Sequence, residues 1–131
     1  MTMDDVPGAY AALDPDAVMQ ALYAAGFDGD GRLLQLNSYE NRVFQAHLED
    51  GRVVVAKFYR PGRWNDAQIA EEHAFCAELA EADLPVVAPL ALRPRHGGRE
   101  DLRLDAVTDT LAHVRTAGDG QYRLAVTERR V

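Results

Sequence analysis

The chain has 131 residues, of which 47% are hydrophobic and 27% are charged, as in a globular domain with a modest core. Its net charge of −7 argues against nucleic acid or an anionic membrane surface as a partner. We expect a cytoplasmic location, because Cys76 is the single cysteine, the N-terminus lacks a signal-peptide pattern, and no apolar run approaches the roughly 20 residues of a membrane span.

The first predicted element is a helix that follows a flexible arm, residues 1–12. Asp14 is a favourable N-cap, and Pro15 suits the first helical position. An apolar stripe with spacings of four and three residues follows: Val18, Leu22 and Ala25. Gly26 is expected to end the helix, whose stripe should pack against a sheet.

Three strands are predicted next, at residues 31–37, 42–48 and 52–59, with a tight turn at residues 49–51 between the last two. Successive side chains of a strand point to opposite faces of the sheet. The third strand then has two faces, Val53, Val55 and Lys57 on one and Val54, Ala56 and Phe58 on the other. We expect these strands to form an antiparallel meander.

A second helix is predicted to run to about residue 82, because Asn65 and Gln68 form a capping box at its start. Trp64 and Ile69 are expected to pack across this start as a hydrophobic staple.

Three further elements are predicted beyond this helix. Residues 86–88 lie between two prolines and are expected to open a fourth strand at or near a sheet edge. Residues 104–117 are predicted as a short helix, from apolar residues at spacings of three, four and three: Leu104, Val107, Leu111 and Val114. Residues 122–126 alternate and indicate a strand.

Lys57 is the strongest chemical signal in the chain. A lysine that follows three valines and an alanine on a strand is costly unless an anion meets it. The second helix offers Glu72, with Glu71 as the alternative, and such a lysine would also meet phosphate oxygens. The ordinary alternative is a lysine on an edge strand that extends its ammonium into solvent.

Three segments carry a resemblance to a known family. They are Asn-Ser-Tyr-Glu-Asn-Arg at residues 37–42, Val-Ala-Lys-Phe-Tyr-Arg-Pro-Gly-Arg-Trp at residues 55–64 and Glu-Glu-His at residues 71–73. With them, residues 10–92 resemble the N-terminal lobe of the bacterial stress response kinase A family. Members of that family are Ser/Thr protein kinases similar to the aminoglycoside and choline phosphotransferases.

The resemblance implies an α+β fold: an antiparallel kinase-like N-lobe sheet of about five strands, one packed helix of the αC type and the extra N-terminal helix. Residues 13–131 would form this lobe. The resemblance also implies an ATP-binding set, in which Lys57 and Glu72 hold phosphates, the loop 38–41 lines them and two valines cover the adenine. The set is Ser38, Tyr39, Glu40, Asn41, Val43, Val55, Lys57 and Glu72. Without the family, the loop is an ordinary strand connection and the valines are core residues.

Two alignments of the C-terminal region with the family remain open. In the first, residues 119–130 are the fifth strand of the lobe and residues 93–118 are an insertion. In the second, residues 94–99 are the hinge and the fifth strand has been deleted. We prefer the first, because a sheet without its fifth strand leaves a long bare edge.

The catalytic residues of the family have no counterpart in the sequence. The family holds its base Asp and its metal-binding Asn and Asp in a C-terminal lobe, to which nothing after residue 92 of this sequence is similar. The aspartates beyond residue 92 lack the neighbouring His-Gly and Asn of that motif: Asp101, Asp105, Asp109 and Asp119. The resemblance implies ATP and Mg²⁺, but no catalytic residue and no metal ligand is predicted in this chain.

The sequence therefore predicts the N-lobe of a stress-response-type Ser/Thr kinase, which binds ATP through its phosphates and does not catalyse transfer alone. Its partners would be ATP and a separately encoded C-lobe or another protein. The alternatives are a non-catalytic interaction module, which uses the surface that normally rests on a C-lobe, and the remnant of a truncated kinase gene.

Overall fold

The computed structural model describes residues 13–36, 41–59, 65–82, 87–95, 102–116 and 121–129. The two helices of these residues are α1 (Pro15–Ala24) and α2 (Asp66–Glu81). Their six strands are β1 (Gly29–Leu36), β2 (Arg42–Leu48), β3 (Val53–Tyr59), β4 (Leu102–Ala106), β5 (Ala112–Thr116) and β6 (Gln121–Glu128). The arm predicted for residues 1–12 lies outside the described residues.

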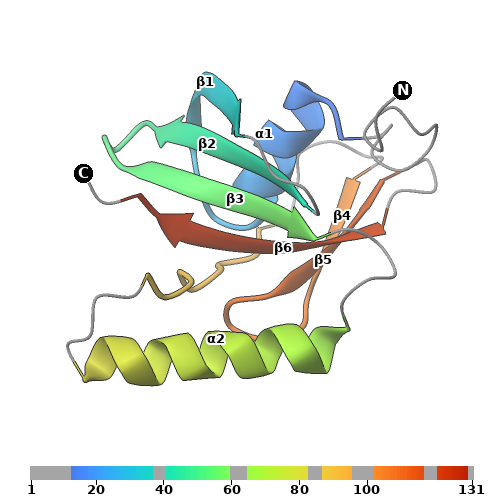
Figure 1. The fold of residues 1–131 in the computed structure, drawn as a ribbon. Helices are drawn as coiled ribbons and strands as arrows, with labels where there is room; N and C mark the ends of the chain where they lie inside the picture. The colour runs from blue at the N-terminus through green and yellow to red at the C-terminus, as the bar shows by residue number, and fades with distance from the viewer. Residues whose placement is uncertain are drawn as a thin grey trace, which may run out of the picture.

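All six strands belong to one antiparallel sheet with the order β1-β2-β3-β6-β5-β4. The two helices lie on opposite sides of this sheet (Figure 1). The α+β class is thus confirmed, with six strands where about five were expected. Among the described residues, no helix has the length and apolar character needed to cross a bilayer.

Helix α1 begins and ends where its local sequence predicts. The backbone N–H of Ala17 donates to Asp14 Oδ1 at 2.7 Å, and Pro15 occupies the first turn. The stripe of Val18, Leu22 and Ala25 is fully buried. Gly26 follows with a φ of +102°, a backbone conformation that residues other than glycine rarely adopt, and the chain turns there into β1.

The main core lies between α1 and the sheet. The period of two places Val54, Ala56 and Phe58 of β3 on this face, and all three are fully buried. Phe58 makes edge-to-face ring contacts with Phe44 at 6.0 Å and with Tyr122 at 6.4 Å between centroids. This core fixes β2, β3 and β6 against one another and leaves their other face for α2.

The helix predicted for residues 104–117 is wrong. The segment forms β4 and β5, a hairpin in which Leu104 pairs with Val114. The apolar residues of each strand alternate, and the turn at residues 107–111 happens to place Val107 and Leu111 at helical spacing. Residues 93–118, expected as an insertion, therefore contribute two strands to the sheet.

The strand next to β3 is β6, with Lys57 opposite Ala125. This is the position that the first alignment gives to the fifth strand, whereas the second alignment deletes that strand. The fourth strand expected to open at residues 86–88 is not formed in the described segment 87–95, where a single bridge joins Pro89 to Thr127. Proline has no N–H to extend such a ladder.

Helix α2 begins with the predicted capping box. Asn65 Oδ1 accepts from the N–H of Gln68 at 2.8 Å, and Gln68 Oε1 accepts from the N–H of Asn65 at 3.0 Å. Trp64, the other half of the expected staple, lies outside the described residues. In the described part of the chain, α2 buries only Ile69 and His73. It is therefore attached to the sheet by a small contact area.

Candidate functional site

The face of the sheet that carries Lys57 is the side covered by α2. Val43 lies opposite Lys57, and Lys57 lies opposite Ala125, so the three adjacent strands β2, β3 and β6 meet at this level. Val55 precedes Lys57 by two residues on the same face. Val43, Val55 and Lys57 are all half-buried. The structure thus brings three of the predicted ATP-binding residues together on one mainly apolar face of the sheet.

The predicted phosphate loop is only partly visible. Ser38, Tyr39 and Glu40 lie outside the described residues. Asn41 is half-buried directly before β2, and it is the one member of the loop that the described residues include. The strands on either side, β1 and β2, are paired from Leu36 and Val43 onward, so the loop connects two neighbouring strands as the sequence predicts.

The ammonium of Lys57 lies over an aromatic ring. Its Nζ is 4.7 Å from the ring centroid of Tyr59, two residues further along β3. Among the described residues, no carboxylate forms a salt bridge with Lys57, and the ion pair expected with Glu72 is therefore not made in this structure. Tyr59 was not among the predicted site residues, although its two-residue offset from Lys57 places both side chains on one face of β3.

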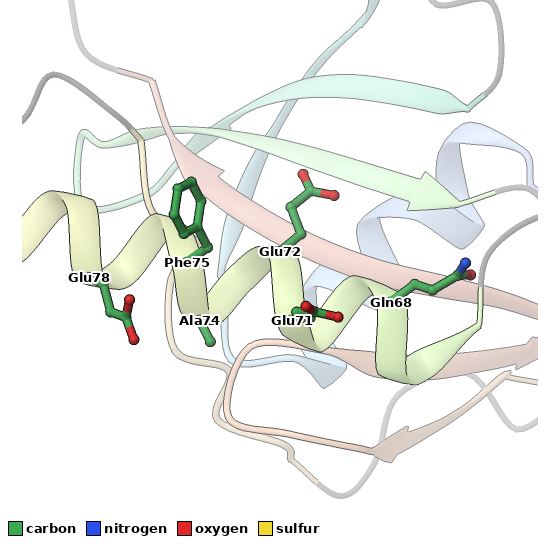
Figure 2. Close-up of a pocket in the computed structure, with 6 residues that line it drawn as sticks. All are labelled: Gln68, Glu71, Glu72, Ala74, Phe75 and Glu78. Atoms are coloured by element: carbon green, nitrogen blue, oxygen red, sulfur yellow. The ribbon is translucent and has the colours of Figure 1, made fainter.

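Glu72 nevertheless lies close enough to act on this face electrostatically. Burial raises the pKa of Tyr59 to about 12, and the negative charge of Glu72 adds to this increase. Figure 2 shows Glu72 and Phe75 on one side of α2 and Glu78 on the other. Glu71 and Glu72 are both exposed. Glu72, rather than Glu71, is the carboxylate that perturbs the groups near Lys57.

His73 is the one buried ionisable residue of α2 in the described chain. Its Nδ1 lies 2.8 Å from the hydroxyl oxygen of Thr110, in the turn between β4 and β5. Burial lowers the pKa of His73, which favours the neutral imidazole, and the positive charge of Lys57 acts in the same direction. His73 thus joins α2 to the β4–β5 turn by a neutral hydrogen bond.

A second contact fixes the start of α2. Asp66 Oδ1 accepts from Arg123 Nε at 2.5 Å and lies 2.7 Å from His113 Nε2. The hydrogen bonds from Arg123 and His113 lower the pKa of Asp66. Asp66 is in the first turn of α2, whereas Arg123 and His113 are on β6 and β5, so one carboxylate connects the helix to two strands.

Helix α2 carries a shallow, open hollow of about 470 Å³. Its lining, drawn in Figure 2, consists of Gln68, Glu71, Glu72, Ala74, Phe75 and Glu78. Three carboxylates make this hollow unfavourable for phosphate groups.

The order of β1, β2 and β3, with one lysine facing a helix, is accompanied by sequence similarity over the same residues. The model of the phosphotransferase enzyme family matches residues 32–125, from β1 to β6. The chain belongs to the phosphotransferase enzyme family. The match covers well over half of the chain and includes Lys57, Glu72 and the strand pair β3–β6.

Several relatives from enteric bacteria are similar to this phosphotransferase-family chain. Stress response kinase A of Salmonella choleraesuis (strain SC-B67) is 49% identical over 89 residues, which is 68% of this chain and 27% of that protein. Serine/threonine protein kinase RdoA of Salmonella typhimurium is 49% identical over the same coverage. Stress response kinase A of Escherichia coli (strain K12) is 50% identical over 82 residues, 63% of this chain and 25% of that protein. The chain thus spans about a quarter of the length of these relatives.

Proposed function

We propose that this chain supplies the N-lobe of an ATP-dependent Ser/Thr protein kinase of the stress response type and contributes the phosphate-binding half of the ATP site. The observation that carries the proposal is the position of Lys57, which is the only lysine of the sequence. It lies on one face with Val43 and Val55, within a segment similar to stress response kinase A. We place the protein in the cytoplasm, as its single cysteine indicates.

The chemistry of this face suits a nucleotide. Val43 and Val55 offer branched apolar side chains that an adenine ring can cover, while Lys57 offers a charge for the phosphates. Asn41 and the loop 38–40 before it would add donors at the phosphate end. Glu72 would lie at the helix side of the same lysine and face its ammonium.

Phosphate oxygens can bind Lys57 while its ammonium stays over the Tyr59 ring. A cation–π contact at a partly exposed site is worth about 0.5–1 kcal/mol. Hydrogen bonds between an ammonium and phosphate oxygens are charge-assisted and roughly twice as strong as neutral ones. Because an ammonium has three N–H donors, the phosphates would add to the contact with the ring and need not replace it.

Phosphoryl transfer would need residues from another chain or lobe. The sequence lacks a counterpart for the base and for the Asn and Asp that hold Mg²⁺ in the related kinases. The described residues also offer no group of three His, Cys, Asp or Glu side chains close enough for a metal ion. Because the loss of one transition-state donor costs about 10²–10³ in rate, we propose that the chain alone does not turn over. Mg²⁺ would neutralise negative charge on the nucleotide phosphates, and its protein ligands would come from the other lobe.

Calorimetric titration tests the half-site. Mg-ATP, ADP and adenosine are titrated into the purified chain, into Lys57→Ala and into Arg103→Ala, whose exposed side chain lies on β4, distant from β2 and β3 in strand order. We expect Lys57→Ala to weaken the binding of ATP and ADP at least about tenfold and to leave the affinity for adenosine unchanged. Arg103→Ala should leave all three affinities unchanged. Equal ATP affinity in the Lys57→Ala variant would refute the half-site. Phosphorylation of a generic protein substrate above background would refute the inactivity of the isolated chain.

An interaction module is the second candidate, because large apolar residues on different elements are exposed, among them Leu34 and Phe75. Leu34 of β1 is 56% exposed and Phe75 of α2 is 58% exposed. Sedimentation and binding of an apolar dye test this candidate. A monomer that binds no dye, in a chain that binds ATP, leaves the nucleotide half-site as the function.

A further inference from the structure

Lys57 contacts Tyr59, a residue of β3 that lies outside the proposed ATP-binding set. Both side chains belong to β3, two residues apart and on the same face of the sheet. The Lys57 ammonium is 4.7 Å from the centroid of the Tyr59 ring, within the range of a cation–π contact. No carboxylate among the described residues bridges to this ammonium.

The Tyr59 ring is held from three directions. It is 4% exposed and belongs to a separate small cluster with Ile69, Leu111 and Ala125. Ile69 belongs to α2, Leu111 ends the β4–β5 turn, and Ala125 is on β6. Because Ile69 and Leu111 are fully buried, the position of the ring depends on how α2 and the turn pack on the sheet.

We infer that Tyr59 is a positioning residue for Lys57: its ring face holds the ammonium at the proposed phosphate site and transmits the packing of α2 and of the β4–β5 turn to that lysine. The functional half of this inference rests on the proposed nucleotide site. A ring face suits this role because it orients the ammonium but, unlike a carboxylate, does not accept its hydrogen bonds. The ammonium stays available to phosphate oxygens.

The chain offers a direct spectroscopic test, because Lys57 is its only lysine. Labelling with ¹³C-lysine gives a single set of side-chain signals. In the unmodified chain, the Hε protons should be shifted upfield by the ring current of Tyr59. Tyr59→Phe keeps the ring and should keep the shift. Tyr59→Leu should abolish it, and Glu72→Gln should leave it in place.

Two outcomes of the labelling experiment overturn the inference. One is an Hε signal of the unmodified chain at the position of free lysine, which needs no variant and so holds even if Tyr59→Leu does not fold. The other is loss of the shift in Glu72→Gln with retention in Tyr59→Leu. Tyr59→Phe is a sound conservative control, because no hydrogen bond from the Tyr59 hydroxyl occurs among the described residues.

Nucleotide titrations then test the functional half. Tyr59→Leu should weaken the binding of ADP roughly two- to fivefold and leave the affinity for adenosine unchanged, since only the phosphates would contact Lys57. Tyr59→Phe should restore the ADP affinity of the unmodified chain. Equal ADP affinity in Tyr59→Leu and the unmodified chain overturns the positioning role. If the unmodified chain binds no nucleotide, the proposed function fails, while the labelling experiment still decides whether Tyr59 holds Lys57.

Discussion

Replacing Asp66 by asparagine is expected to loosen α2 from the sheet. The carboxylate accepts hydrogen bonds from Arg123 at 2.5 Å and lies 2.7 Å from His113 Nε2. Asparagine keeps the shape of the side chain and removes its charge. The same change removes an acidic group from the first turn of α2, where the helix dipole favours it.

The magnitude follows from the burial of the three partners. The side chains of Asp66, Arg123 and His113 are 36%, 22% and 19% exposed. Hydrogen bonds to charged groups are worth about 1.5–3 kcal/mol when buried, and exposed ion pairs about 0.2–1 kcal/mol. For this partly exposed group we expect about 1.5 kcal/mol from the two contacts. The helix dipole adds about 0.5 kcal/mol, so the free energy of unfolding should fall by about 2 kcal/mol.

The assay is equilibrium unfolding in urea, with Asp30→Asn as the matched control. Asp30 also pairs with an arginine, Arg32, at 2.7 Å, but the Arg32 side chain is 69% exposed. That exposed pair should contribute little to the free energy of unfolding. For a chain of this size, the loss expected for Asp66→Asn corresponds to a fall in Tm of roughly 6–10 °C. A double-mutant cycle with Arg123→Gln isolates the pair itself.

The pH dependence gives an independent check on Asp66. The hydrogen bond from Arg123, followed by that from His113, lowers the pKa of Asp66 below its ordinary value of 3.8. The stabilisation is therefore complete above pH 3.8 and is lost as the pH falls through the lower pKa of the folded state. The difference between Asp66→Asn and the unmodified chain should shrink in this acidic range. Equal losses for Asp66→Asn and Asp30→Asn at neutral pH would refute the reasoning.

Two further changes test the packing of the helices. Gly26→Ala should lower the free energy of unfolding by about 2–3 kcal/mol, because the φ of Gly26 is +102° and the new Cβ would lie 2.8 Å from the Arg93 carbonyl oxygen. Gly31 has the same φ but no atom within 4 Å of its new Cβ, so Gly31→Ala should lower the free energy of unfolding by only about 1 kcal/mol. Similar losses in urea unfolding of the two variants would contradict the close approach. Burial lowers the pKa of His73 below its ordinary 6.5, so the unfolded chain takes up this proton first and stability should fall as the pH drops below 6.5. His73→Gln should flatten this decline in unfolding curves between pH 7 and 5; an unchanged slope would exclude His73 as its source.

Local signals in the sequence determined the starts of both helices and the faces of the central strands. Asp14 and Asn65 act within three residues of themselves, and their caps form as the sequence indicates. The period of two placed Val55 and Lys57 on one face of β3 and Val54 and Phe58 on the other, because side chains alternate along any extended strand. The loop that carries Ser38, and the ATP-binding role of the whole set, stay predictions.

Only the tertiary structure decided how the C-terminal region is used. Residues 104–117 have apolar spacings that satisfy a helix, but pairing with β6 makes them a hairpin, and the hydrogen bonds of the sheet outweigh a weak local preference. The partners of Asp66 lie 47 and 57 residues away, and those of the Tyr59 ring come from α2, the β4–β5 turn and β6. Such contacts depend on strand order, which no short stretch of sequence encodes, and so the groups around Lys57 became visible only when the sheet was assembled.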